Sequence, residues 1–208
     1  MSFYDRKKLS EKYLPIIKKI SNKKCFSIKR IGIDTYKKDD INDAIYDILM
    51  SNETRYDPVI HSLRFSGNLI FFYNNKGYKA EMNYSTSEHD FYSIEIDSYE
   101  GMLNESKRFP KYSVFFILIT DNRIDACWIE HINFHEIRIP KWRALKYEID
   151  TEKYFKEKKR KYPKCEKIHF TNERDKGSGT PYGFIYKNAS YIKPLSKFLE
   201  NIKKRQQV

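Results

Sequence analysis

The sequence predicts a mixed α/β protein in which a central β-sheet is flanked by helices. Three observations predict this fold class. Segments between residues 59 and 97 alternate between apolar and polar side chains, with the period of two expected of β-strands. Apolar residues at helical spacing precede and follow these segments, and residues 114–120 are almost entirely apolar, as expected of a strand buried on both faces. A chain of 208 residues is most simply one domain, with a core at 39–137 and basic extensions at 1–38 and 138–208.

The segment before the alternating strands predicts two helices and one short strand. Residues 8–20 have apolar residues at helical spacing, and Pro15 requires that this helix begins near Leu14 or is kinked. Residues 25–33 alternate weakly, which indicates a short strand. Asp39-Asp40 supplies an acidic N-cap for the amphipathic helix that follows.

Four consecutive strands are then predicted to form an antiparallel meander. They are Val59–Phe65, Leu69–Tyr73, Tyr78–Tyr84 and Phe91–Asp97. Asn74-Asn75-Lys76-Gly77 predicts a hairpin turn, because Asn and Gly tolerate positive φ. A helix capped by Ser98 and ended by Pro110 is expected next, followed by the buried strand at 114–120 and a strand at 124–132.

Beyond Pro140 the composition becomes strongly basic. Lys153–Lys161 has a helical pattern with aromatic residues interleaved among the basic ones, and 175–181 predicts a flexible loop. Tyr182–Tyr186 is predicted to be an added edge strand. The apolar residues between Leu195 and Ile202 predict a short terminal helix that packs on the core or on a partner subunit.

Carboxylates gather on the predicted meander. Glu95 and Asp97 are two residues apart and should share one face of the last strand. Glu81 lies on the preceding strand, and Asp90, at the turn between the two strands, is its alternative as a first metal ligand. Lys79 is expected on the same strand face as Glu81. Oxygen ligands of this kind are those that Mg²⁺ prefers.

This pattern resembles the PD-(D/E)xK nuclease superfamily, which includes Holliday-junction resolvases and many restriction enzymes. Members have the order helix, three-stranded meander, helix, strand, with an acid on the second strand and a D/E-x-K pair on the third. Glu81 matches the first acid and Glu95-x-Asp97 matches the pair. Asp97 stands where the superfamily usually has Lys, although some members carry an acid there. The resemblance covers Asp39–Ile132, and its motif is short.

The resemblance implies a restriction-endonuclease-like core and a metal-dependent nuclease that hydrolyses phosphodiester bonds in DNA, including branched DNA. Mg²⁺ or Mn²⁺ would be held by Glu81 or Asp90 together with Glu95, and Asp97 would bind a second ion or position the attacking water. Lys79 or a Lys of the helix predicted after Ser98 would supply the positive charge that the superfamily takes from its Lys, and Lys79 is preferred because it shares a strand face with Glu81. Resolvase-like members are dimers, so the resemblance also implies a homodimer.

The distribution of charge favours a polyanionic partner. The net charge is +12, yet residues 39–137 hold 17 acidic and 8 basic residues, while 138–208 hold 20 basic and 8 acidic ones. Basic surface binds phosphate backbones by releasing counterions, which predicts DNA as the partner. The candidate nucleic-acid-binding residues are Lys141, Arg143, Lys158, Lys159, Arg160, Lys161 and Lys176.

Two other interpretations stay open. The absent Lys favours a non-catalytic nucleic-acid-binding protein with a degenerate nuclease fold, and a basic scaffold protein is the third class. Acids on the outer face of a sheet are also common without any catalytic role. Three scattered cysteines and the lack of an apolar N-terminal segment or membrane span predict a cytoplasmic protein, in a host cell if viral. The Lys, Ile, Asn and Tyr bias is similar to that of archaeal virus proteins.

Overall fold

The computed structural model describes residues 12–30, 69–86, 89–108, 110–111, 113–140, 150–171 and 181–206. These residues form four α-helices and two mixed β-sheets, so the predicted mixed α/β class is confirmed. The helix predicted after Asp40, the strand predicted at 59–65 and the candidate residues Lys141, Arg143 and Lys176 lie outside the described part of the chain. None of the described helices combines the length and the apolar character needed to cross a bilayer.

The first sheet contains six strands in the order β1-β2-β3-β5-β6-β10. Their bounds are β1 Ser27–Arg30, β2 Leu69–Tyr73, β3 Lys76–Tyr84, β5 Val114–Thr120, β6 Arg123–Trp128 and β10 Lys193–Pro194. β1, β2 and β3 form an antiparallel meander, whereas β3 and β5 are parallel. The hairpin between β2 and β3 has Asn74 and Asn75 at φ 47° and 61°, so the turn predicted from these residues is confirmed.

The second sheet contains four strands in the order β4-β9-β7-β8. Their bounds are β4 Phe91–Glu95, β9 Tyr182–Tyr186, β7 Glu136–Pro140 and β8 Lys167–Thr171. β9 lies between β4 and β7, so its predicted position at a sheet edge is wrong, although its existence as a strand is confirmed. β7 and β8 are parallel, and the chain between them includes a helix.

The prediction that Phe91–Asp97 is the last strand of the meander is wrong in two respects. β4 pairs with β9 and not with β3, and it ends at Glu95 because helix α5 begins at Ile96. The amide of Ile96 donates to the carbonyl of Pro181, close to the start of β9. A partner about 90 residues away in the sequence therefore determines where this strand lies, and local periodicity contains no information on that pairing.

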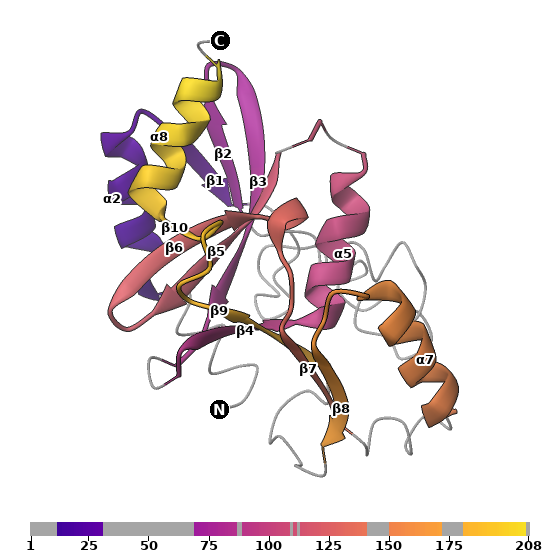
Figure 1. Cartoon of the computed structure of the whole chain (residues 1–208). Helices are drawn as coiled ribbons and strands as arrows, with labels where there is room; N and C mark the ends of the chain where they lie inside the picture. The colour runs from indigo at the N-terminus through magenta and orange to yellow at the C-terminus, as the bar shows by residue number, and fades with distance from the viewer. Residues whose placement is uncertain are drawn as a thin grey trace, which may run out of the picture.

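The helices cover both sides of the first sheet (Figure 1). α2 (Leu14–Lys23) and α8 (Leu195–Gln206) lie side by side against one face, and Pro15 falls in the first turn of α2, as one of the two predicted alternatives requires. α5 (Ile96–Ser106) lies on the other face. α7 (Thr151–Lys161) is capped by Asp150, whose carboxylate accepts hydrogen bonds from the amides of Glu152 and Lys153. Strand β6 gives way at Ile129 to the 3₁₀ turn η2 (Ile129–His131), so the predicted strand at 124–132 is shorter than expected.

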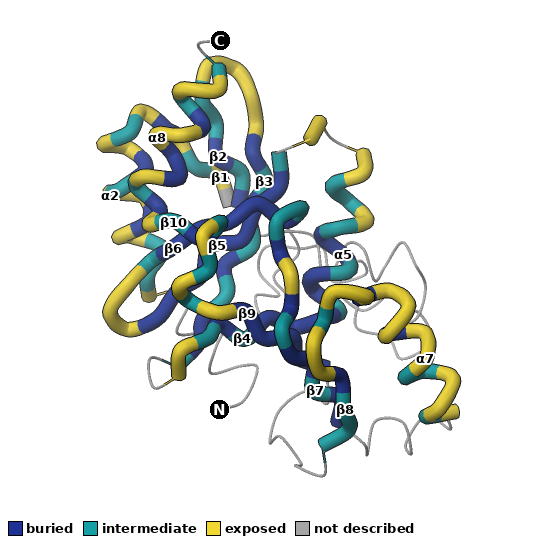
Figure 2. The backbone as a smooth tube through the Cα atoms, viewed as in Figure 1, coloured by how far each residue is buried: buried dark blue, intermediate teal, exposed yellow. Residues whose placement is uncertain are grey.

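Two hydrophobic cores lie on opposite sides of β5, all seven residues of which are buried (Figure 2). Phe115, Ile117 and Ile119 face a core shared with α2 and α8. Phe116 and Leu118 face a second core that lies between the first sheet, the second sheet and α5. The alternation of side chains along one strand thus separates the α2–α8 layer from the layer that contains the second sheet.

We expect Gly183→Ala to destabilise the protein by about 1–3 kcal/mol, because an added Cβ would lie 2.3 Å from the ring of Phe134. That ring is buried and packed edge-on against Tyr99 and Tyr162, so it cannot easily move away. Gly77→Ala is a matched control, since its Cβ would make only ordinary contacts of 3.5 Å or more. Urea denaturation measures both changes, and an equal effect of the two substitutions would contradict the expectation.

Candidate functional site

The two carboxylates predicted to share one strand face lie on different elements. Glu95 is the last residue of β4, and its carboxylate accepts a 2.8 Å hydrogen bond from the buried hydroxyl of Tyr182. Only 8% of Glu95 is exposed. Asp97 lies in the first turn of α5, where a negative charge is favoured by the helix dipole. The two acidic residues of the E-x-D pair therefore lie at the end of a strand and in the first turn of the helix that follows.

Lys79 and Glu81 do share a face of β3, as predicted. The alternate residues Tyr78, Ala80 and Met82 point into the core beneath α2 and α8, so Lys79 and Glu81 point to the side on which α5 lies. The ammonium group of Lys79 forms an ion pair with Glu105 of α5. This lysine thus holds the helix onto the sheet in the described structure.

Asp90, the alternative first ligand, is exposed just before β4, where its carbonyl accepts a hydrogen bond from the amide of Lys187. The four predicted metal ligands accordingly lie on β3, before β4, at the end of β4 and at the start of α5. Within the described ranges, no group of three or more His, Cys, Asp or Glu side chains is placed to hold a metal ion. The described carboxylates do not by themselves form a magnesium site, and we derive no chemical step through one.

The expected order of helix, three-stranded meander, helix and strand is interrupted. α2, the antiparallel meander β1-β2-β3, α5 and β5 occur in this order along the chain, but β4 of the second sheet lies between β3 and α5. The register differs from the expected one, because Glu81 lies on the third strand of this meander and not on the second. The second strand, β2, contains no acidic residue.

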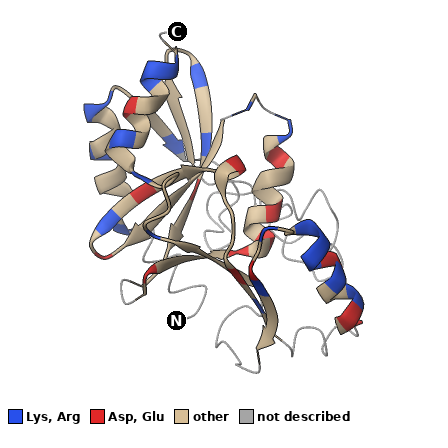
Figure 3. Cartoon of the chain, viewed as in Figure 1, with Lys and Arg blue, Asp and Glu red and all other residues tan. Residues whose placement is uncertain are grey.

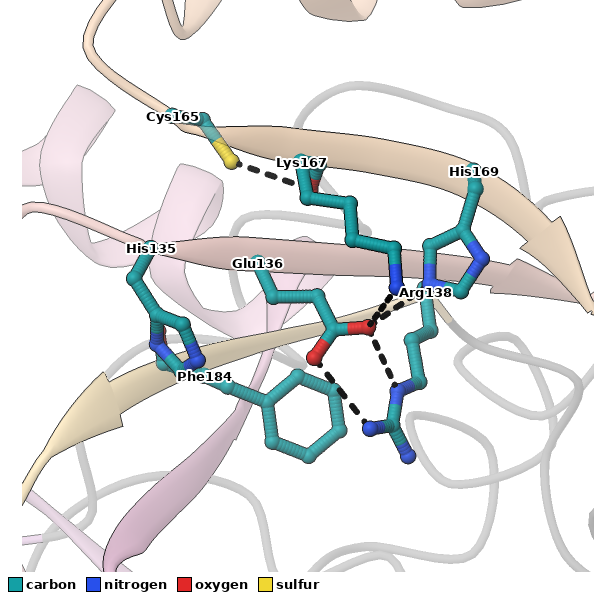
Figure 4. A network of polar contacts seen from close by, with 7 residues as sticks. All are labelled: His135, Glu136, Arg138, Cys165, Lys167, His169 and Phe184. Carbon is teal, nitrogen blue, oxygen red and sulfur yellow. Dashed lines mark hydrogen bonds and ion pairs between the residues drawn. The ribbon is translucent and has the colours of Figure 1, made fainter.

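A network of charged side chains occupies one face of the second sheet (Figure 4). Glu136 of β7 binds Arg138 through both carboxylate oxygens, at 3.1 and 3.2 Å, and the Nε2 atom of His169 on β8 lies 2.7 Å from Glu136 Oε1. Lys167 of β8 adds a longer contact of 3.8 Å. Burial disfavours the charged form of Glu136, but hydrogen bonds from Arg138 and His169 outweigh it and lower its pKa to about 2.

Strand register explains why these residues meet. Glu136 is paired with Lys167 across the parallel ladder, and Arg138 is paired with His169, so all four point to the same face. The opposite face, with Ile137 and its neighbours, belongs to a hydrophobic core. This network was not predicted from the sequence, although the alternation from Glu136 to Ile139 is the signal of a strand with one polar face.

Aromatic side chains continue the same face of the sheet toward β4. The ring of Phe91 is stacked on His89 at 5.2 Å and meets Phe184 edge-on at 5.1 Å. His135 is stacked on Tyr186 at 4.1 Å. The Arg138 guanidinium lies 4.5 Å from the centre of the Phe184 ring, which connects these aromatic residues to the charged network. We call the two groups together the outer face of the second sheet.

The basic helix α7 contributes less exposed charge than its sequence indicates. It holds six basic and two acidic residues, but Lys158 and Lys161 bind the carboxylate of Glu100 on α5, at 2.6 and 2.8 Å. Burial works against the charge on Glu100, and the two lysines together with Tyr162 still lower its pKa. Lys158 is itself buried, so this ion pair holds α7 against α5.

Of the residues predicted to bind nucleic acid, Lys159 and Arg160 are exposed on α7. Lys158 and Lys161 take part in the ion pairs with Glu100. The remaining three, Lys141, Arg143 and Lys176, are outside the described part of the chain.

A second basic surface lies over the outer sides of α2 and α8 (Figure 3). We call it the α2–α8 surface and define it by the exposed basic residues Lys18, Lys19, Lys23, Lys197, Lys204 and Arg205. α2 contains no acidic residue, and the one acidic residue of α8, Glu200, forms an ion pair with Lys24. This surface therefore has almost no negative charge to offset its positive charge.

Comparison of the chain with protein-family models, curated proteins and solved structures finds no match in any of the three.

We expect the Glu136 network to contribute to stability at neutral pH and to lose this contribution in acid. Because the folded-state pKa is depressed from 4.5 to about 2, the contribution is present above the unfolded pKa and is lost as the pH falls toward 2. It amounts to at most about 3 kcal/mol. Glu136→Gln should be less stable than the wild type at pH 7, and the difference should shrink at pH 3.

Urea denaturation at the two pH values measures this difference. Glu157→Gln, at an exposed position of α7, is the control and should change the stability little at either pH. If Glu136→Gln showed the same difference from the wild type at pH 3 as at pH 7, the carboxylate would not be held ionised by its neighbours.

Proposed function

We propose that this protein binds nucleic acid through the α2–α8 surface. The observation that carries the proposal is the imbalance of charge on these two packed helices. They have exposed lysines and an arginine but a single acidic residue, Glu200, which already forms an ion pair with Lys24. A phosphate backbone is the polyanion that such a surface attracts, because bound counterions are released into solution.

The arrangement of the surface supports a long, regularly charged ligand. α8 has twelve residues and therefore extends about 18 Å, over which duplex DNA carries roughly ten phosphate charges. Both helices are fixed to the same hydrophobic core through Ile17 and Phe198, so the basic side chains extend from a rigid support. Binding then requires less ordering of the backbone and side chains, which reduces its entropic cost.

The exposed basic residues of α7 support the same function from another side of the molecule. Lys153, Lys159 and Arg160 are exposed there, but the acidic Glu152 and Glu157 are exposed on the same helix. Because this mixed surface attracts phosphate less strongly than the α2–α8 surface, we assign the main contact to α2 and α8.

We expect the double substitution Lys18→Glu and Lys19→Glu to weaken binding to duplex DNA about tenfold or more. The slope of log affinity against log salt concentration should also decrease in magnitude by about 1–2, because phosphate contacts are lost. Fluorescence anisotropy with a labelled 20-base-pair duplex at several salt concentrations measures both quantities. The proposal assigns this binding to the lysines on α2.

The matched control is the double substitution Lys107→Glu and Arg108→Glu, which reverses two exposed charges just after α5. It should reduce the affinity much less than the substitutions on α2. Equal losses from the two charge reversals would show that only net charge matters, and undetectable duplex binding by the wild-type protein would reject the proposal.

Metal-dependent hydrolysis of DNA is the second candidate function. It is favoured by the shared face of Lys79 and Glu81 on β3. The element order matches that of PD-(D/E)xK nucleases only in part, because β4 lies between the meander and α5. Within the described residues, no group of three or more His, Cys, Asp or Glu side chains is placed to hold a metal ion, which favours binding as the first candidate.

For this candidate we expect nicking of supercoiled DNA with Mg²⁺ or Mn²⁺ and none with EDTA. Glu81→Ala should lower the rate on the order of 100-fold or more, and Glu157→Ala should leave it unchanged. Agarose gels of plasmid DNA resolve the products. Duplex binding without nicking in the presence of either Mg²⁺ or Mn²⁺ would reject hydrolysis and leave the binding function in place.

A further inference from the structure

The outer face of the second sheet has chemistry that the α2–α8 surface lacks. Its members are aromatic at one end and cationic at the other, and they belong to all four strands or to the residues beside them. Tyr186 is 45% exposed although it is a large aromatic side chain, and His89 is exposed as well. Both are stacked on a second ring, His135 and Phe91 respectively, which holds them in place.

The rings and the cations form one continuous strip. Phe91 contacts Phe184, Phe184 lies under the Arg138 guanidinium, and Arg138 binds Glu136. The exposed side chain of Lys167 and the half-exposed ring of His169 border the same carboxylate. A planar ligand placed on Tyr186 would lie next to Phe184, the preceding residue on this strand face, whose ring lies 4.5 Å from the Arg138 guanidinium.

The one carboxylate in this strip, Glu136, is already bonded to three neighbouring basic groups. Two of these, Arg138 and Lys167, carry a fixed positive charge at neutral pH, so the cationic end of the strip stays positive despite Glu136. Glu95, at the other edge, is buried and accepts the hydrogen bond from Tyr182. The exposed cations of the strip, Lys167 and the partly exposed Arg138, are complementary in charge to a phosphodiester.

We propose that the outer face of the second sheet binds an unpaired segment of nucleic acid, with a base stacked on Tyr186 and the adjoining phosphate near Arg138 and Lys167. This inference rests on the proposed nucleic-acid function and names a second contact for it. A duplex keeps its bases stacked inside, where a ring on a flat sheet cannot reach them, whereas an unpaired base exposes its π face. The expected ligand is therefore single-stranded.

Fluorescence anisotropy with labelled 12-nucleotide oligothymidylate, oligouridylate and an abasic 12-mer of the same charge tests the proposal. The wild-type protein should bind one of the base-containing strands at least fivefold more tightly than the abasic strand. Tyr186→Ala should remove this preference by weakening the base-containing complex about fivefold to a hundredfold. Affinity for a 20-base-pair duplex should not change.

Tyr186→Phe is the matched control, because it keeps the ring and should keep the preference for bases. Urea denaturation of both variants reports whether Tyr186→Ala alters the fold, which an exposed position should tolerate. Equal wild-type affinity for base-containing and abasic strands would overturn the stacking proposal. So would retention of the preference in Tyr186→Ala.

The two proposals fail in different ways. Duplex binding that depends on Lys18 and Lys19, with no preference for bases, would reject only the contact at the sheet. Absence of binding to every oligonucleotide would reject both contacts.

Discussion

The architecture depends on the burial of β5 on both faces. Phe115 and Ile117 face the α2–α8 core, while Phe116 and Leu118 face the core beneath the second sheet. Because a strand buried on both sides needs a layer on each side, this one segment requires the helices on one face and the second sheet and α5 on the other. The two proposed binding surfaces are the outward sides of these two layers.

The parallel pairing of β3 with β5 explains where β4 lies. A parallel connection requires the chain to leave one end of the sheet and return at the other, and here that crossover contains β4 and α5. β4 is thereby carried into the second sheet, where it pairs with β9. Glu95 accordingly lies at the end of β4, where its carboxylate accepts a hydrogen bond from Tyr182 of β9.

The features that local sequence determines were predictable. Pro15 marks the start of α2, Asn74 and Asn75 form the hairpin, and the apolar run at 114–120 is the buried strand. The shared face of Lys79 and Glu81 also followed from the period of two. These conclusions need only neighbours within a few residues along the chain.

The second sheet could not be predicted in the same way. β4, β9, β7 and β8 are separated by long connections, and alternation in each strand does not say which strand it joins. The candidate carboxylates were predicted on one sheet, whereas Glu81 lies in the first sheet, Glu95 in the second and Asp97 in α5. The network around Glu136 was missed for the same reason, because Arg138 and His169 meet only through the β7–β8 ladder.

Net charge alone also does not show which basic residues are available to bind nucleic acid. Lys158 and Lys161 are conspicuous in the sequence, yet they hold Glu100, and Lys79 holds Glu105. A lysine that pairs with a half-buried carboxylate cannot move to a phosphate without leaving that carboxylate buried and unpaired, which is unfavourable. The exposed lysines on α2, a helix without acidic residues, can bind a phosphate without this penalty.

The separation of the two surfaces restricts the ligand that could use both. The α2–α8 surface and the outer face of the second sheet lie beyond the two opposite faces of β5, so a straight duplex bound to one does not lie along the other. A nucleic acid with a duplex part and a flexible unpaired part could reach both. Each contact would then raise the effective concentration of the other, and affinity for such a ligand should exceed that for either part alone.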